Sequence, residues 1–122
     1  MLGINLLFAG FILILNGIGG LRELNPKMHG VANILVGMVV GIDAIFQTSH
    51  SKGTIDFGHV AVMWIFSLNY ILIAAHSFIS PPDWLILGVY EIFASLVCAA
   101  FAYQSWKQHN GVLLYLWVMW GL

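Results

Sequence analysis

Charged residues are scarce in this chain of 122 residues: four Lys and Arg and five Asp and Glu make up 7% of the sequence. The two signs nearly cancel, and the formal net charge at pH 7 is -1 when histidines are neutral. Such a balance offers neither the basic surface of a nucleic-acid-binding protein nor an acidic tail. Nucleic acid is therefore excluded as a partner.

Cysteine is limited to Cys98, so no disulfide can form within the chain. Sequence patterns that carry catalysis are also lacking, because there is no glycine-rich phosphate loop and no nucleophile beside a base. His50 and His59 lie in one polar stretch, but two isolated histidines there are more often solvated than metal-bound. We therefore expect neither an enzyme nor a metal site.

Apolar residues, in contrast, are abundant: 61% of the chain is hydrophobic, and its mean hydropathy is +0.94. A water-facing surface with so much apolar area would aggregate. A membrane-spanning helix needs about 20 mostly apolar residues, and four segments meet that requirement. The sequence therefore predicts an all-α, multi-pass transmembrane helix bundle in one domain, residues 1–122. Its helices are expected at about 1–21, 29–47, 58–79, 83–104 and 111–122.

The last of these segments contains only 12 residues, Gly111 to Leu122, about 18 Å of helix. That length does not cross a bilayer. Its sequence, "GVLLYLWVMWGL", fits either a fifth span that is incomplete or a helix lying at the membrane interface, where Trp and Tyr are favoured. Length alone does not separate these alternatives.

The first segment places two amides, Asn5 and Asn16, on one helical face together with Leu6 and Leu13. An amide without a partner is costly in lipid, so this face should meet protein or water. A narrow apolar pore with a few amides would satisfy it, and so would interhelical hydrogen bonds.

Glycines recur at regular spacing on the first two segments, where they favour close helix packing. They are Gly3, Gly10 and Gly17, followed by Gly30, Gly37 and Gly41. Two carboxylates also fall inside predicted spans, where each costs about 2.5–3.5 kcal/mol. Glu91 lies in mid-span and is a candidate pore or gating residue, whereas Asp43 is close enough to a loop to reach the membrane interface.

Three stretches of the sequence resemble the AmiS/UreI family of urea and short-amide channels. They are "MLG..LL..G..LI.NGI.GL....PK.....N..VG" from Met1 to Gly37, "HSF" with "DW.....Y..F" between His76 and Phe93, and "W..WG" at Trp117 to Gly121. The resemblance implies about six spans, a pore within each protomer, a homo-oligomeric, hexameric ring and no cofactor. It also implies a bacterial cytoplasmic membrane and an amino terminus outside the cell. The end of the fifth helix and the sixth helix have no counterpart, so we expect the 122-residue form to conduct poorly.

The resemblance implies which residues line the pore. They are the aliphatics Leu2, Leu6 and Leu13, the indoles Trp117 and Trp120, and, with a register that can slide by one residue, Phe66 and Tyr70. Three polar residues are added to the expected lining because of where they lie in the predicted spans: Asn5 and Asn16 on one face of the first segment, and Glu91 in mid-span. Flat, neutral solutes such as urea can pass between indole and aliphatic walls, whereas a hydrated ion finds no replacement ligands there.

The function that the resemblance implies, and that these residues suit, is a passive channel for urea or short aliphatic amides across a lipid bilayer. Histidines in the outward-facing loops are candidate pH sensors, because imidazole changes charge in mild acid. They are His50, His59 and His109. The alternative is a small membrane subunit or scaffold without transport, in which the same faces only pack helices.

Overall fold

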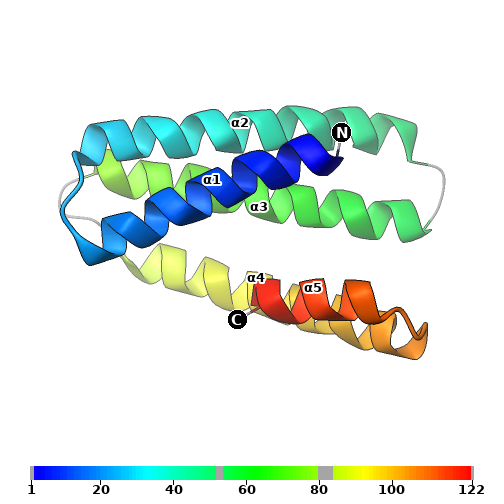
Figure 1. Cartoon of the computed structure of the whole chain (residues 1–122). Coiled ribbons are helices and arrows are strands. Elements are labelled where there is room, and N and C mark those ends of the chain that lie inside the picture. The colour runs from blue at the N-terminus through cyan, green and yellow to red at the C-terminus, as the bar shows by residue number, and fades with distance from the viewer. Residues whose placement is uncertain (1, 52–53, 80–83, 122) are drawn as a thin grey trace. The chain divides into compact units, whose positions relative to one another are not determined.

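The computed structural model describes residues 2–51, 54–79 and 84–121, without the side chains of residues 2–4, 54–57 and 59. Within these ranges the chain is all-helical, as predicted, and has no strand. Its helices are α1 (Leu2–Leu21), α2 (Pro26–His50), α3 (Thr54–Phe78), α4 (Trp84–Lys107) and α5 (Gly111–Gly121) (Figure 1). The second and third helices begin a few residues earlier than the sequence suggested.

Polar residues between the apolar segments set the helix ends. The Asn25 side chain accepts a hydrogen bond from the backbone N–H of Met28 at 3.2 Å, and Pro26 occupies the first turn of α2. Asn110 caps α5 in the same way through the N–H of Leu113 at 3.1 Å. Since asparagine oxygens satisfy free N–H groups and proline lacks one, both helices start where the sequence changes from polar to apolar.

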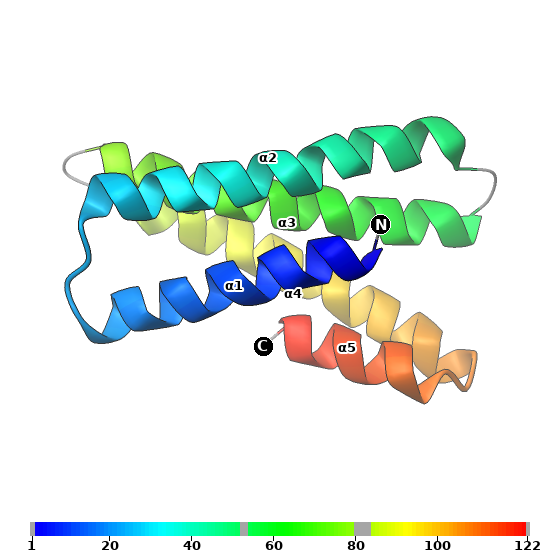
Figure 2. The same ribbon diagram turned by 45° about the horizontal axis from the view of Figure 1, so that its top comes forward.

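The chain divides into two compact units, Met1–Trp84 and Leu85–Leu122. In the first unit α2 and α3 lie side by side and antiparallel, and α1 runs antiparallel to α2 (Figures 1 and 2). The second unit is the hairpin of α4 and α5. Each unit is described separately below.

Glycines on α2 bring its backbone close to α3. A Cβ atom added at Gly37 would lie 3.1 Å from the Ser67 carbonyl oxygen, and one at Gly41 would lie 2.7 Å from Ser67 Oγ. The Ser67 hydroxyl donates across this contact to the Gly37 carbonyl at 2.8 Å. The close packing predicted for the glycines of the second segment is therefore present, and Ser67 adds an interhelical hydrogen bond.

The glycines of α1 behave differently. A Cβ atom at Gly10 or Gly17 would meet nothing within 4 Å in the described part of the chain. The third member of this stripe, Gly3, lies outside the residues whose surroundings are described. The two described glycines thus leave one flank of α1 open, and α1 reaches α2 with a different face.

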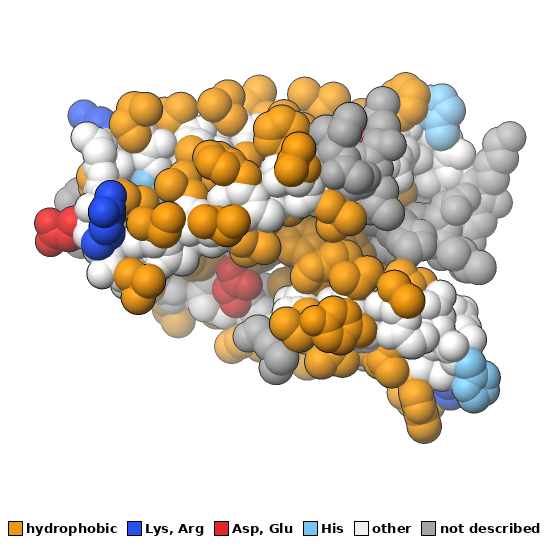
Figure 3. Space-filling view, in the orientation of Figure 1, with side chains coloured by type: hydrophobic (Ala, Val, Ile, Leu, Met, Phe, Trp, Pro, Cys, Tyr) orange, Lys and Arg blue, Asp and Glu red, His pale blue; other side chains and the backbone are white. Residues whose placement is uncertain are grey.

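Buried apolar side chains from all three helices form the core of the first unit. They are Ile12, Val36, Val40, Ala44, Met63 and Tyr70. Beyond this core most large apolar side chains are exposed, and they cover the flanks of the helices on the face seen in Figure 3, with Lys and Arg at the ends. Among the described residues, three helices are long and apolar enough to cross a membrane: Pro26–His50, Val60–Phe78 and Trp84–Lys107. The exposed apolar surface is thus suited to lipid.

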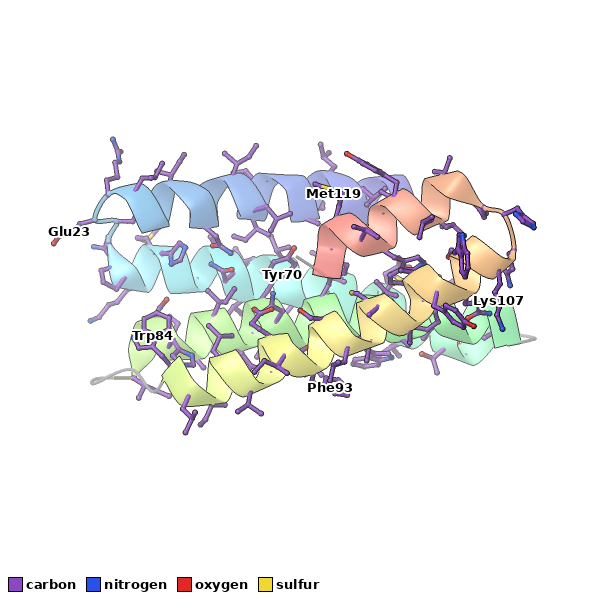
Figure 4. The ribbon with its side chains drawn as sticks, turned by 90° about the horizontal axis from the view of Figure 1, so that it is seen from below. Glu23, Tyr70, Trp84, Phe93, Lys107 and Met119 are labelled. Atoms are coloured by element: carbon purple, nitrogen blue, oxygen red, sulfur yellow. The ribbon has the colours of Figure 1, made fainter. Side chains whose placement is uncertain are left out.

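In the second unit, α5 packs against α4 through Trp117, which is 4% exposed. Its ring stacks on Phe101 with centroids 4.7 Å apart. A Cβ atom at Gly121 would lie 3.1 Å from the Cβ of Cys98, so this cysteine fills a buried position at a close helix contact. Phe93 and Met119, labelled in Figure 4, are exposed residues of the same two helices.

We expect Gly37→Ala to destabilise the chain by about 1–3 kcal/mol, because the new methyl group is pressed against the α3 backbone. Gly10→Ala is the matched control, and it should be neutral or stabilising by up to about 1 kcal/mol, because alanine favours helix and the site is open. Unfolding in mixed micelles, followed by helical circular dichroism, measures both. Equal losses at the two positions would contradict the helix packing described here.

Candidate functional site

Two polar clusters join α1 to α2. In the first, Asn16 and Asn33 exchange amide hydrogen bonds at 3.1 and 2.9 Å, and Asn33 is completely buried. The His29 Nε2 atom donates at 2.8 Å to Asn16 Oδ1, the oxygen that also accepts from Asn33. Asn33 also donates to the His29 carbonyl at 3.0 Å, so its amide N–H groups are engaged within this cluster.

The second cluster contains a carboxylate. Asn5 donates through its side-chain nitrogen to Asp43 Oδ2, and Gln47 donates to the same oxygen at 3.0 Å. Asp43 is 6% exposed, so its carboxylate is enclosed by protein. The reason is that its side chain points toward α1 rather than along the helix to the loop. Its other oxygen, Oδ1, is buried and has no hydrogen-bond partner among the described residues.

On the predicted polar face of α1, the amides contact α2, whereas the leucines do not take part in these hydrogen bonds. Both amides, Asn5 and Asn16, form interhelical hydrogen bonds, which was one of the two ways to satisfy them. Leu6 and Leu13 are instead 45% and 54% exposed, so they line neither cluster in this structure. Leu2 lies outside the residues whose side chains are described.

The aromatic pair of α3 lies together as expected for an i, i+4 spacing. The Phe66 and Tyr70 rings are 6.3 Å apart between centroids and nearly parallel, with an interplanar angle of 22°. Tyr70 is completely buried among the side chains of the first unit (Figure 4), where it shares the core with Ile12 of α1. Phe66 is half-buried and packs against that core.

The two indoles of α5 contact each other edge to face. Trp117 and Trp120 have ring centroids 5.3 Å apart at 88°, and Trp117 is also the residue that stacks on α4. Trp120 is half-buried. Glu91, in the middle of α4, is exposed. The second unit thus presents Trp120 beside a buried Trp117, and a carboxylate from the preceding helix.

The candidate pH sensors occupy separate places. His50 is exposed at the end of α2, where its Nδ1 lies 2.8 Å from the Phe46 carbonyl and its ring stacks on Phe46 at 4.4 Å. His109 is exposed in the turn before α5 and has a positive φ of 55°. The side chain of His59 lies outside the described residues. Among those described, no group of three or more His, Cys, Asp or Glu residues could hold a metal ion.

Sequence reasoning missed the two partners that α2 supplies to Asn16, which are Asn33 and His29. It also did not predict that Asp43 is buried. Asn33 was nonetheless visible as a lone amide inside an apolar span, a position that demands a partner.

The whole chain, residues 1–122, matches the model of the AmiS/UreI family transporters. The chain belongs to the AmiS/UreI family. It is 30% identical over 115 residues to the acid-activated urea channels of two Helicobacter pylori strains, 26695 and J99. These matches cover 79% of this chain and 58% of each relative. No solved structure matches the chain.

Membership of the AmiS/UreI family confirms several predictions made from the sequence. The chain is a multi-pass helical membrane protein of a transport family, which is not a family of enzymes. The chain spans less than two thirds of the length of the urea channels it matches.

The reciprocal amide pair predicts energetic coupling between α1 and α2. In a double-mutant cycle with Asn16→Leu and Asn33→Leu, we expect a coupling energy of about 0.5–2 kcal/mol, since each single change already removes both amide–amide hydrogen bonds between the two helices. Unfolding free energies in mixed micelles provide the measurement. Thr48→Val, at the far end of α2, should be additive with Asn16→Leu. Strict additivity of the two asparagine changes would show that they do not meet.

Proposed function

We propose that this protein is a passive channel for urea or short aliphatic amides. The observation that carries the proposal is the match of the whole chain to the AmiS/UreI transporters. The relatives that the chain matches are acid-activated urea channels. We extend urea permeation from those proteins to this chain, with small amides as the second solute class.

The side chains available for a pore suit a flat, neutral solute. Trp120 presents an indole face beside Trp117, and the exposed Leu6 and Leu13 give α1 an aliphatic surface. Such walls can contact the π face of urea while excluding the water shell that an ion needs. The proposed lining comprises Leu2, Leu6, Leu13, Phe66, Tyr70, Glu91, Trp117 and Trp120, with Asn5 and Asn16 behind the aliphatic surface of α1.

We place the channel in the bacterial cytoplasmic membrane as a homo-oligomeric ring, hexameric by resemblance. The open flank of α1 at Gly10 and Gly17 is compatible with such an assembly, because small residues let helices of neighbouring protomers approach closely. A scaffold without transport would show the same packing but no solute flux.

Removal of the Trp120 indole should widen the pore. In proteoliposomes made with the polypeptide of the full reading frame, we expect Trp120→Ala to lower the permeability ratio of urea to butyramide by about tenfold. Stopped-flow light scattering gives both permeabilities. Trp106→Ala is the matched control, since Trp106 is 61% exposed on α4. Loss of protein from the membrane with an unchanged ratio would assign Trp120 to packing instead.

We further propose that the loop histidines open the channel in acid. Histidine is the side-chain type that changes charge in mild acid, so under this proposal urea uptake should be faster at about pH 5 than at about pH 7.5. The triple variant His50→Gln, His59→Gln, His109→Gln should lose this difference, whereas His76→Gln, on the opposite side of the membrane, should keep it. Uptake that is equal at both pH values in the unmodified protein would exclude gating, and a response that survives the triple change would assign the sensor to another group.

A further inference from the structure

The Asp43 side chain has one oxygen with two partners and one with none. Both neighbouring amide nitrogens, from Asn5 and Gln47, donate to Oδ2. Oδ1 is buried and lacks a hydrogen-bond partner among the described residues, while the side chain as a whole is 6% exposed. A buried acceptor of this kind costs free energy until a donor reaches it.

We propose that Asp43 Oδ1 binds the NH2 group of the solute, and that this acceptor makes the channel selective for carbonyl compounds that carry NH2. The inference rests on the proposed function and adds to it a selectivity residue outside the pore lining expected from the sequence. The observation that carries it is the oxygen left without a donor beside two amides that are already engaged.

The chemistry of this acceptor distinguishes solutes of one shape. Urea carries two NH2 groups, acetamide carries one, and acetone carries none, although all three are small, planar and neutral. A carboxylate oxygen accepts an N–H in a charge-assisted hydrogen bond, which is stronger than one between neutral groups. A dehydrated metal ion is a poorer occupant, since a single carboxylate with two amides gives fewer ligands than hard cations take.

The position of Asp43 connects this acceptor to the proposed pore. Asn5, which covers it from α1, directly precedes Leu6, one of the exposed aliphatics of the expected lining. The only hydrogen bond that holds the Asn5 amide in the described structure is the one to Asp43. A solute beside Leu6 can therefore reach the carboxylate when the Asn5 side chain turns aside, and its NH2 group then donates to Oδ1, the oxygen that neither Asn5 nor Gln47 bonds.

The two donors to Oδ2 make Asp43→Asn a specific test of Oδ1. Because Asn5 and Gln47 both need an acceptor, the new amide oxygen will occupy the place of Oδ2. Its NH2 group will then stand at the place of Oδ1. The variant keeps the volume and both hydrogen bonds, the one from Asn5 of α1 and the one from Gln47 of α2, but presents a donor to the solute where the native residue presents an acceptor.

Solid-state NMR of the full chain in lipid bilayers tests the proposal. The readouts are the ¹³C resonance of the Asp43 carboxyl group and the ¹⁵N resonances of the Asn5 and Gln47 side-chain amides. We expect urea and acetamide to shift them and acetone to leave them unchanged. In Asp43→Asn, half-maximal change of the amide resonances should require about tenfold more urea, the loss expected for one such hydrogen bond.

Gln47→Met serves as the matched control, since it removes one donor to Oδ2 and leaves Oδ1 in place; the Asp43 response to urea should persist. Equal responses to all three solutes, or an unchanged titration in Asp43→Asn, would overturn the inference. Urea flux into vesicles of the same lipid is measured in parallel. Flux without an Asp43 response rejects this site alone, and an Asp43 response without flux supports the site while rejecting the channel function.

Discussion

Polar groups inside an apolar medium must be paired, and this requirement holds α1 against α2. Two clusters, about 16 Å apart along α1 by helical rise, provide the pairing: Asn16 with Asn33 and His29 at one end, and Asn5 with Asp43 and Gln47 at the other. Apolar side chains give little preference between helix contacts in lipid, because the lipid is equally apolar. The amides therefore decide which face of α1 meets α2 and in which register.

The contact of α2 with α3 depends on close backbone packing instead of paired amides. Glycines replace side chains at the contact, so the backbones approach closely and Ser67 can reach the Gly37 carbonyl. With α1 fixed by amides and α3 by close packing, α2 is the helix to which both neighbours of the first unit are attached. Tyr70 and Ile12 then meet in the core although they come from α3 and α1.

This arrangement bears on the proposed transport because it separates residues that hold helices together from residues that remain exposed. Asn5 and Asn16 are engaged with α2, while Leu6 and Leu13 on the same helix remain exposed. In the α4–α5 hairpin, Trp117 is buried against Phe101, and Trp120 keeps part of its surface. The proposed channel can thus combine a rigid helix contact with an apolar wall on the neighbouring face of one helix.

The sequence by itself determined that the chain is a helical membrane protein of the AmiS/UreI family, and it placed the helices to within a few residues. Apolar run length, Pro and Asn at helix starts, and the quoted motifs are local signals, so they can be read without a structure. It also showed that the amides on α1 need partners, because helical periodicity places them on one face.

Only the tertiary structure decided which partners those are. The register between two helices depends on all their contacts at once, so neither the Asn16–Asn33 exchange nor the burial of Asp43 follows from spacing within one helix. The glycine stripes illustrate the same limit: both favour close packing, yet only the α2 stripe meets a neighbour in the described chain. Periodicity defines the faces of a helix, whereas the neighbour that each face meets is set by the packing of the whole bundle.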